Sequence, residues 1–126
     1  MSDSQRVCSK VLKSLKKFMV GQSQRHICTL AMMVASIVLG KNAQLAVMAK
    51  KIPEATQTKS KFRKLQRFVA NQRIDAEAYY LPFAQQLLLN LADQPLVFAM
   101  DGSVVGRGCM VLMVGVVYRK RLLPLV

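Results

Sequence analysis

The amino-acid sequence predicts a mainly α-helical, basic N-terminal region at about residues 1–94, followed by the first β-strands of an incomplete α/β core at 95–126. Three observations support this division. Before residue 94, apolar side chains recur at the three- and four-residue spacing of amphipathic helices. From Leu96 onward they form short β-type runs separated by turns. Charge changes as well, because residues 1–73 carry 15 basic and two acidic side chains, whereas 74–118 carry one basic and four acidic.

Five helices are expected, at about residues 4–20, 23–39, 42–51, 58–72 and 75–92. Gly40 is predicted to stop the second helix, and Pro53 to end the third, because the residue before a proline disfavours the helical conformation. Asp75 is predicted to be the N-cap of the fifth helix.

The formal net charge of +13 indicates an anionic partner, either nucleic acid or an anionic membrane surface. The one membrane candidate, Ile27–Leu39, has 13 residues, whereas a span needs about 20, which favours a buried core helix. Three dispersed cysteines and a single histidine exclude a disulfide scaffold and a zinc finger. We therefore expect a cytoplasmic protein with nucleic acid and no membrane as its partner, and a basic peripheral membrane protein is the third, less favoured alternative.

The fourth predicted helix, at 58–72, is the most informative. Phe62, Leu65, Phe68 and Val69 form its expected inward stripe, and a polar row made of Lys59, Arg63, Arg67 and Asn71, with Lys64 beside it, occupies the other side. Such a row of like charges indicates an anionic partner, or alternatively a well-hydrated surface.

Residues 42–72 together read as a helix, a proline-containing turn and a second helix, the order of a helix-turn-helix element. In the DNA-binding interpretation, basic side chains neutralise phosphates, and Gln66 or Asn71 reaches a base edge. The predicted DNA-binding residues are Lys59, Arg63, Lys64, Gln66, Arg67 and Asn71.

Asp101 is the candidate catalytic and metal-binding residue of the β region. It follows the short run Leu96–Met100, and a carboxylate at the end of a central strand can hold a hard cation such as Mg²⁺. The alternative is a hairpin turn, because Asp-Gly is a common turn signal. The next run, Cys109–Val117, is apolar on both faces and belongs in the middle of a covered sheet. We therefore expect the chain to be the front part of a larger fold.

Two groups of motifs resemble bacterial insertion-sequence transposases of the DDE type. The segment Lys64-Leu-Gln-Arg-Phe-Val-Ala-Asn71 is similar to their R-L-Q-R-F-L-x-N helix. The start of their catalytic domain is similar to Phe98-Ala-Met-Asp-Gly-Ser103, Gly106-Arg-Gly108, Val111-Leu-Met-Val114 and Arg121-Leu-Leu-Pro-Leu125. The order and spacing of these motifs, rather than any one of them, carry the resemblance.

The resemblance implies a ribonuclease-H-like core that cuts and joins DNA with two divalent ions, Mg²⁺ or Mn²⁺, behind a helical DNA-binding region. It makes Asp101 the first catalytic carboxylate and metal ligand. The second Asp and the Glu of the family would lie beyond Val126, and Leu123 replaces a small residue. This chain alone is therefore expected to lack strand-transfer activity and not to hold the ion stably.

The preferred hypothesis is a truncated DDE transposase that binds double-stranded DNA, in particular terminal inverted repeats, at the nucleoid in the bacterial cytoplasm. The alternative is a non-catalytic DNA-binding regulator that pairs with full-length transposase and inhibits it.

Overall fold

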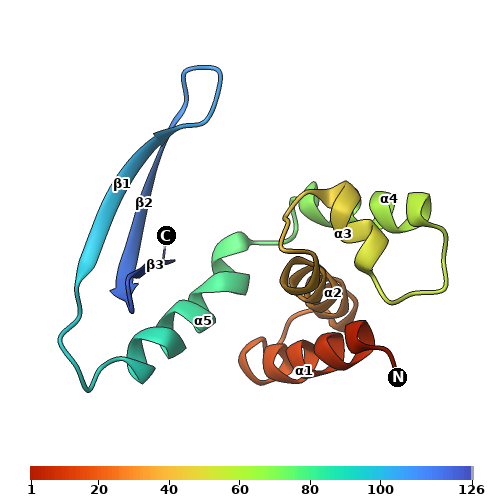
Figure 1. Ribbon diagram of the computed structural model, residues 1–126, viewed down its shortest axis with the longest axis horizontal. Helices are drawn as coiled ribbons and strands as arrows, with labels where there is room; N and C mark the ends of the chain where they lie inside the picture. Colours follow the sequence, from red (N-terminus) through yellow and green to blue (C-terminus); the bar gives the residue numbers. More distant parts are fainter. Residues whose placement is uncertain (126) are drawn as a thin grey trace. The chain divides into compact units, whose positions relative to one another are not determined.

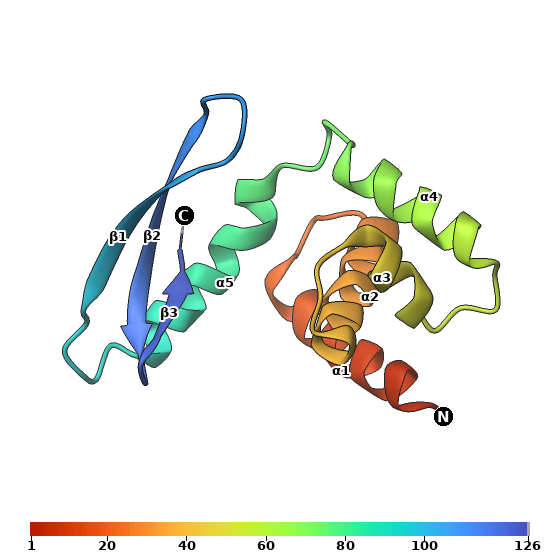
Figure 2. The ribbon, with the colours of Figure 1, turned by 45° about the horizontal axis from the view of Figure 1, so that its top comes forward.

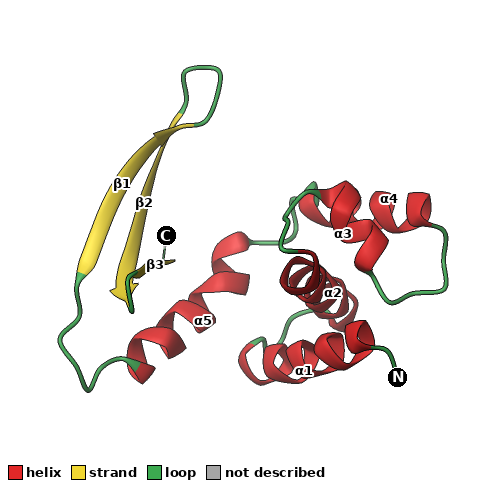
Figure 3. Ribbon diagram, in the orientation of Figure 1, coloured by secondary structure: helices red, strands yellow, loops and turns green. Residues whose placement is uncertain are grey.

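The computed structural model describes residues 1–125, which form five helices followed by a small antiparallel sheet (Figure 1). The helices are α1 (Asp3–Phe18), α2 (Gln24–Gly40), α3 (Leu45–Lys51), α4 (Thr58–Val69) and α5 (Ala76–Asn90). The strands are β1 (Phe98–Val104), β2 (Met110–Tyr118) and β3 (Arg121–Pro124). The predicted order of helices and then strands is thus confirmed (Figure 3).

The chain divides into two compact units, one from Met1 to Tyr79 and the other from Tyr80 onward. The boundary lies within α5, whereas the sequence placed it near residue 94. The hydrophobic pattern changes where helix gives way to strand, but this change does not reveal which neighbours α5 contacts.

In the first unit, α1 packs against α2. A capping box starts α1, since the Ser2 hydroxyl accepts from the backbone N–H of Gln5 at 3.3 Å and the Gln5 side chain accepts from the backbone N–H of Ser2 at 2.9 Å. The side chains buried on these two helices and in the turn between them include Leu15, Met19, Ile27, Ala31 and Ala35. Gly40 does not stop α2, which includes it. The residue in the left-handed conformation that ends the helix is Lys41, with φ of 50°.

A second part of this core is formed where α3 and α4 pack against each other and against α2. Met48, Ala49 and Ile52 pack with Leu65, which is fully buried. Lys61 of α4 is also buried, and its Nζ donates to the backbone carbonyl of Ile52 at 3.0 Å, which satisfies a carbonyl at the end of α3. Val69 was predicted to belong to the inward stripe of α4, and this prediction is wrong. Val69 is the last residue of the helix, and its side chain is 62% exposed.

The second unit holds the antiparallel sheet, with strand order β1-β2-β3 (Figure 2). β2 is the central strand, as its apolar character predicted. Asp101 lies in the middle of β1, where it pairs with Met113, and not at the end of a strand. The Asp-Gly turn interpretation is wrong as well. The hairpin reverses at 105–109, where Gly106, Arg107 and Gly108 all have positive φ.

The strand β2 is apolar on both faces, and the structure leaves many apolar side chains of the sheet exposed. Val116 is fully buried, whereas Met100, Val104, Met110 and Leu112 are each more than 60% exposed. β2 and β3 approach closely at Gly115, where a Cβ atom would lie 2.8 Å from the backbone oxygen of Leu123 and 2.6 Å from the Leu122 side chain.

The structure also bears on the membrane question. Among residues 1–125, no single helix has the length and apolar character needed to cross a bilayer; α2 and α3 meet that measure only as a pair bent by 94°.

Candidate nucleic-acid interface

The exposed side of α4 carries the polar row predicted from the sequence. Because Leu65 anchors the helix to the core, side chains on the opposite side of the wheel face solvent. The exposed members of the predicted set are Lys59, Arg63, Gln66 and Arg67, while Lys64 and Asn71 are half-buried. The helix therefore presents cations at successive turns along one side.

A groove of about 960 Å³ runs beside this row, and we call it the α2–α4 groove. One wall comes from the N-terminal half of α2, the other from α4, and the connection 54–56 closes it. Four of the six predicted residues line it, namely Arg63, Lys64, Arg67 and Asn71; Lys59 and Gln66 do not. All lining residues belong to the first unit.

The positive charge of the groove is largely uncompensated. In the described part of the chain only two ion pairs form, Arg6 with Asp3 and Lys64 with Glu54. Arg25, Arg63 and Arg67 thus have no carboxylate oxygen of a described residue within 4.0 Å. Glu54 is the one acidic residue in the lining. Three guanidinium groups in and beside one cavity give it the chemistry of an anion-binding site.

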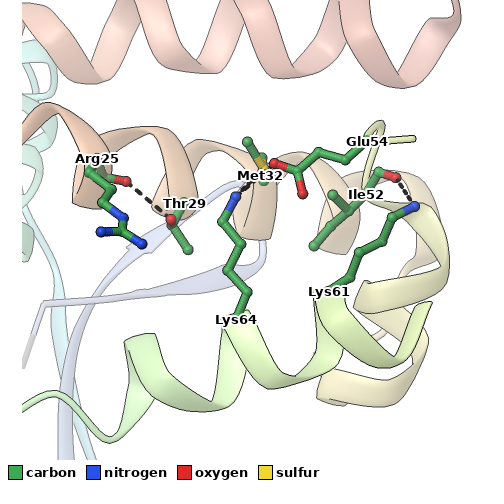
Figure 4. Close-up of polar contacts among 7 residues, drawn as sticks. All are labelled: Arg25, Thr29, Met32, Ile52, Glu54, Lys61 and Lys64. Carbon is green, nitrogen blue, oxygen red and sulfur yellow. Dashed lines mark hydrogen bonds and ion pairs between the residues drawn. The ribbon is translucent and has the colours of Figure 1, made fainter. Parts of the chain in front are cut away.

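Lys64 differs from the other predicted cations because it is already paired. Its Nζ lies 2.7 Å from Oε1 of Glu54 and 3.9 Å from the sulfur of Met32. Figure 4 shows this side chain reaching from α4 toward α2, with the Glu54 carboxylate beside its amino group. Lys64 therefore holds the 54–56 connection against α4 and α2, instead of presenting a free charge to a ligand.

The groove lining also includes four residues of α2 that were not among the predicted site residues, namely Arg25, His26, Cys28 and Thr29. Arg25 extends from α2 on the side that faces α4 (Figure 4). His26 makes an edge-to-face contact with the ring of Phe68, with centroids 6.2 Å apart and planes at 79°. The available signal was the polar pair Arg25 and Thr29, spaced four residues apart in a helix that is mostly apolar.

Asn71 follows α4 at one end of the groove. Its Oδ1 accepts from the backbone N–H of Arg73 at 3.0 Å, which fixes the side chain in a local turn. This bond leaves the amide N–H₂ group available as a donor. Asn71 can thus offer hydrogen-bond donors to a ligand in the groove.

The connection between α3 and α4 differs from that of an ordinary helix-turn-helix. It comprises residues 52–57, six in all, whereas the motif joins its helices with about three or four. The two helices nevertheless pack against each other through Met48, Ile52 and Leu65.

The environment of one cysteine thiol in the first unit shifts its pKa. Burial raises the pKa of Cys8, and the charges of Cys28 and Glu54 raise it further. The neutral thiol is therefore favoured in the folded state.

Asp101 does not gather the ligands that a divalent ion needs. It is exposed on β1, and within residues 1–125 no three His, Cys, Asp or Glu side chains come together as a possible metal site. Two-metal chemistry needs several carboxylates around ions about 4 Å apart. The described donor set does not fit this requirement.

Comparison with known proteins gives no further assignment, because no known protein family, curated protein or solved structure matches this chain.

Proposed function

We propose that this chain binds double-stranded DNA through the exposed cations of α4 and the α2–α4 groove, as the DNA-binding part of a protein related to DDE transposases. The observation that carries the proposal is a set of uncompensated cations in one cavity, Arg25 from α2 and Arg63 and Arg67 from α4. Lys59 of α4 adds a further cation outside the cavity. A protein that crowds such charges without partners loses stability through repulsion, unless an anion compensates them.

The spacing of the cations suits a polyanion. Residues four apart on a helix rise about 6 Å along its axis, so Lys59, Arg63 and Arg67 cover about 12 Å. Over that length duplex DNA presents several phosphates, since it carries one charge per about 1.7 Å of its axis. The guanidinium groups make paired, geometrically defined hydrogen bonds to phosphate oxygens, which positions the protein on the duplex.

Base recognition in this proposal falls to the amide side chains. Gln66 is exposed on α4 next to the basic row, and Asn71 keeps its N–H₂ group free. Amide side chains suit adenine edges in the major groove. The proposed target is a terminal inverted repeat of a mobile element, which follows from the resemblance to DDE transposases.

For the β region we propose that Asp101 is the counterpart of the first catalytic acid. The strand order β1-β2-β3, with the acid on β1 and the Arg121–Leu125 motif on and just after β3, agrees with the order of motifs on which the resemblance rests. Any metal-dependent reaction at Asp101 would need further carboxylates besides the residues described.

Fluorescence anisotropy with a labelled duplex tests the DNA-binding proposal. The double variant Arg63→Gln/Arg67→Gln removes two cations of the interface, and Lys13→Gln/Lys16→Gln removes two exposed cations of α1 as a charge-matched control. We expect the first variant to weaken binding by at least tenfold and the second by less than threefold. Equal losses in both variants would show that binding depends on net charge alone and would reject this interface.

A second arm uses vesicles that contain anionic phosphatidylserine. The proposal requires the wild-type protein to prefer the duplex at equal phosphate concentration and physiological salt. Tighter binding to the vesicles would favour a membrane partner and reject the DNA assignment.

A further inference from the structure

The α2–α4 groove is larger than the proposed contacts to duplex phosphates require. Its volume of about 960 Å³ lies at the upper end of the range of about 300–1,000 Å³ that is usual for small-molecule sites. A phosphate oxygen bound to an exposed arginine needs no cavity at all. The groove therefore has room for a larger group than a phosphate.

The lining combines two kinds of chemistry. Arg25 on the α2 wall and Arg67 on the α4 wall supply positive charge without a carboxylate partner. Phe68, a half-buried residue of the same lining whose ring contacts His26, supplies an aromatic surface. A ligand that uses both must carry an anion and a planar ring, which is the chemistry of a nucleotide.

Polar groups at the edges of the groove fit the same ligand. The free N–H₂ of Asn71 can donate to an acceptor on a base. Lys64 and Glu54 are bonded to each other, so they form a preorganised wall that does not have to rearrange. Preorganisation lowers the entropic cost of binding.

A base inside an intact duplex cannot reach such a groove, because it is stacked and paired within the helix. An unpaired nucleotide can place its base on an aromatic side chain, and stacking of this kind tolerates any base. The ligand that satisfies both parts of the lining is therefore a nucleotide that has left the duplex.

We propose that the α2–α4 groove binds one unpaired nucleotide, with its base against Phe68 and its phosphate on Arg25 and Arg67, so that the chain prefers DNA with an unpaired end over flush-ended DNA. This inference rests on the proposed DNA-binding function. The same chemistry is present in a free mononucleotide, but exposed Lys59 outside the groove and exposed Arg63 in its lining continue the row of cations along α4, which indicates that the nucleotide belongs to a longer strand.

The test compares two labelled duplexes of identical sequence, one flush-ended and one with a single-stranded overhang of three nucleotides. For the wild-type chain we expect about tenfold tighter binding of the overhang probe, which is within the range for stacking one base. Phe68→Leu should remove this preference and leave the affinity for the flush-ended duplex within threefold. Phe68→Tyr, which keeps the aromatic ring, should retain the preference.

A second measurement needs no variant. A 2-aminopurine base in the overhang should change its fluorescence on binding because its stacking changes, whereas the same base inside the duplex should not. dAMP in solution should abolish the overhang preference and weaken flush-ended binding only in part, because it would occupy Arg25 and Arg67 but leave Lys59 and Arg63 for duplex phosphates.

The outcomes separate the two proposals. If the wild-type chain binds both duplexes tightly and equally, the nucleotide inference is wrong and the duplex-binding function stands. If neither duplex binds, the proposed function itself is wrong. If dAMP binds directly while the overhang gives no preference, a free nucleotide is the ligand, and the assignment to a DNA end is overturned.

Discussion

The ion pair between Lys64 and Glu54 leads to a prediction that the sequence pattern alone would not make. Five basic or amide side chains lie on the polar side of α4. Lys64 is 2.7 Å from a carboxylate, whereas no carboxylate of residues 1–125 lies within 4.0 Å of Arg63 or Arg67. Only cations that bind phosphates release counterions from DNA. Lys64→Gln should therefore leave the salt dependence of binding unchanged, and Arg63→Gln/Arg67→Gln should reduce it.

The magnitude follows from the number of free cations. Arg25, Lys59, Arg63 and Arg67 give four phosphate contacts, so log K against log[salt] should fall with a slope of about −3.6, at about 0.9 per contact. The double variant should have a slope of about −1.8. If the non-electrostatic part is unchanged, this loss corresponds to about 60-fold weaker binding at 0.1 M salt and about ninefold at 0.3 M.

The assay is fluorescence anisotropy of a labelled duplex between 0.05 and 0.4 M salt, with each variant checked for helix content. Lys64→Gln leaves Glu54 unpaired in the groove, so a modest loss of affinity is expected at every salt concentration. Lys64→Gln/Glu54→Gln removes both charges and should recover that loss. A slope reduced by about 0.9 in Lys64→Gln would mean that Lys64 contacts a phosphate, and would refute the reasoning from the ion pair.

Three predictions concern stability and are measured by chemical denaturation. Gly115→Ala should lower the free energy of unfolding by about 1–3 kcal/mol, because its Cβ would lie 2.8 Å from the Leu123 backbone oxygen. The control is Gly102→Ala, whose Cβ would meet nothing nearer than a flexible methionine side chain at 3.7 Å. This substitution should change the free energy of unfolding far less. Among residues 1–125 the buried Tyr79 hydroxyl has no hydrogen-bond partner, so Tyr79→Phe should raise the free energy of unfolding by about 1 kcal/mol; a decrease would show that the hydroxyl is satisfied. Burial raises the pKa of Tyr79 and of the Cys8 thiol above their usual values of 10.0 and 9.0, so the neutral forms stabilise the fold at lower pH. Stability should fall as the pH rises above about 9, and a flat profile from pH 8 to 11 would contradict these shifts.

Local patterning was enough to predict most of the secondary structure. Periodicity and capping residues act over one or two helical turns, so five helices and their approximate bounds follow from the sequence. Asp75 is an example, because its Oδ1 accepts from the backbone N–H of Glu77 at 3.0 Å, as an N-terminal capping residue does. The apolar run of β2 likewise indicated a central strand before any partner strand was known.

The errors occurred where a neighbour distant in the sequence decides the outcome. Asp-Gly favours a turn locally, yet Asp101 lies within β1 because pairing with Met113 extends the ladder past it. The reversal moves to Gly106 and Gly108, which accept positive φ without a steric cost.

The properties of the candidate site likewise fall into those set by local sequence and those set by tertiary packing. The sequence by itself determined that α4 is amphipathic and basic, because that property depends only on the spacing of residues along one helix. Tertiary structure alone decided which charges remain free, since the pairing of Lys64 with Glu54 and the position of Arg25 across the groove depend on how α2, the 54–56 connection and α4 pack. A charge on a helical wheel has a direction, but only the packing of the surrounding chain gives it a partner or leaves it to a ligand.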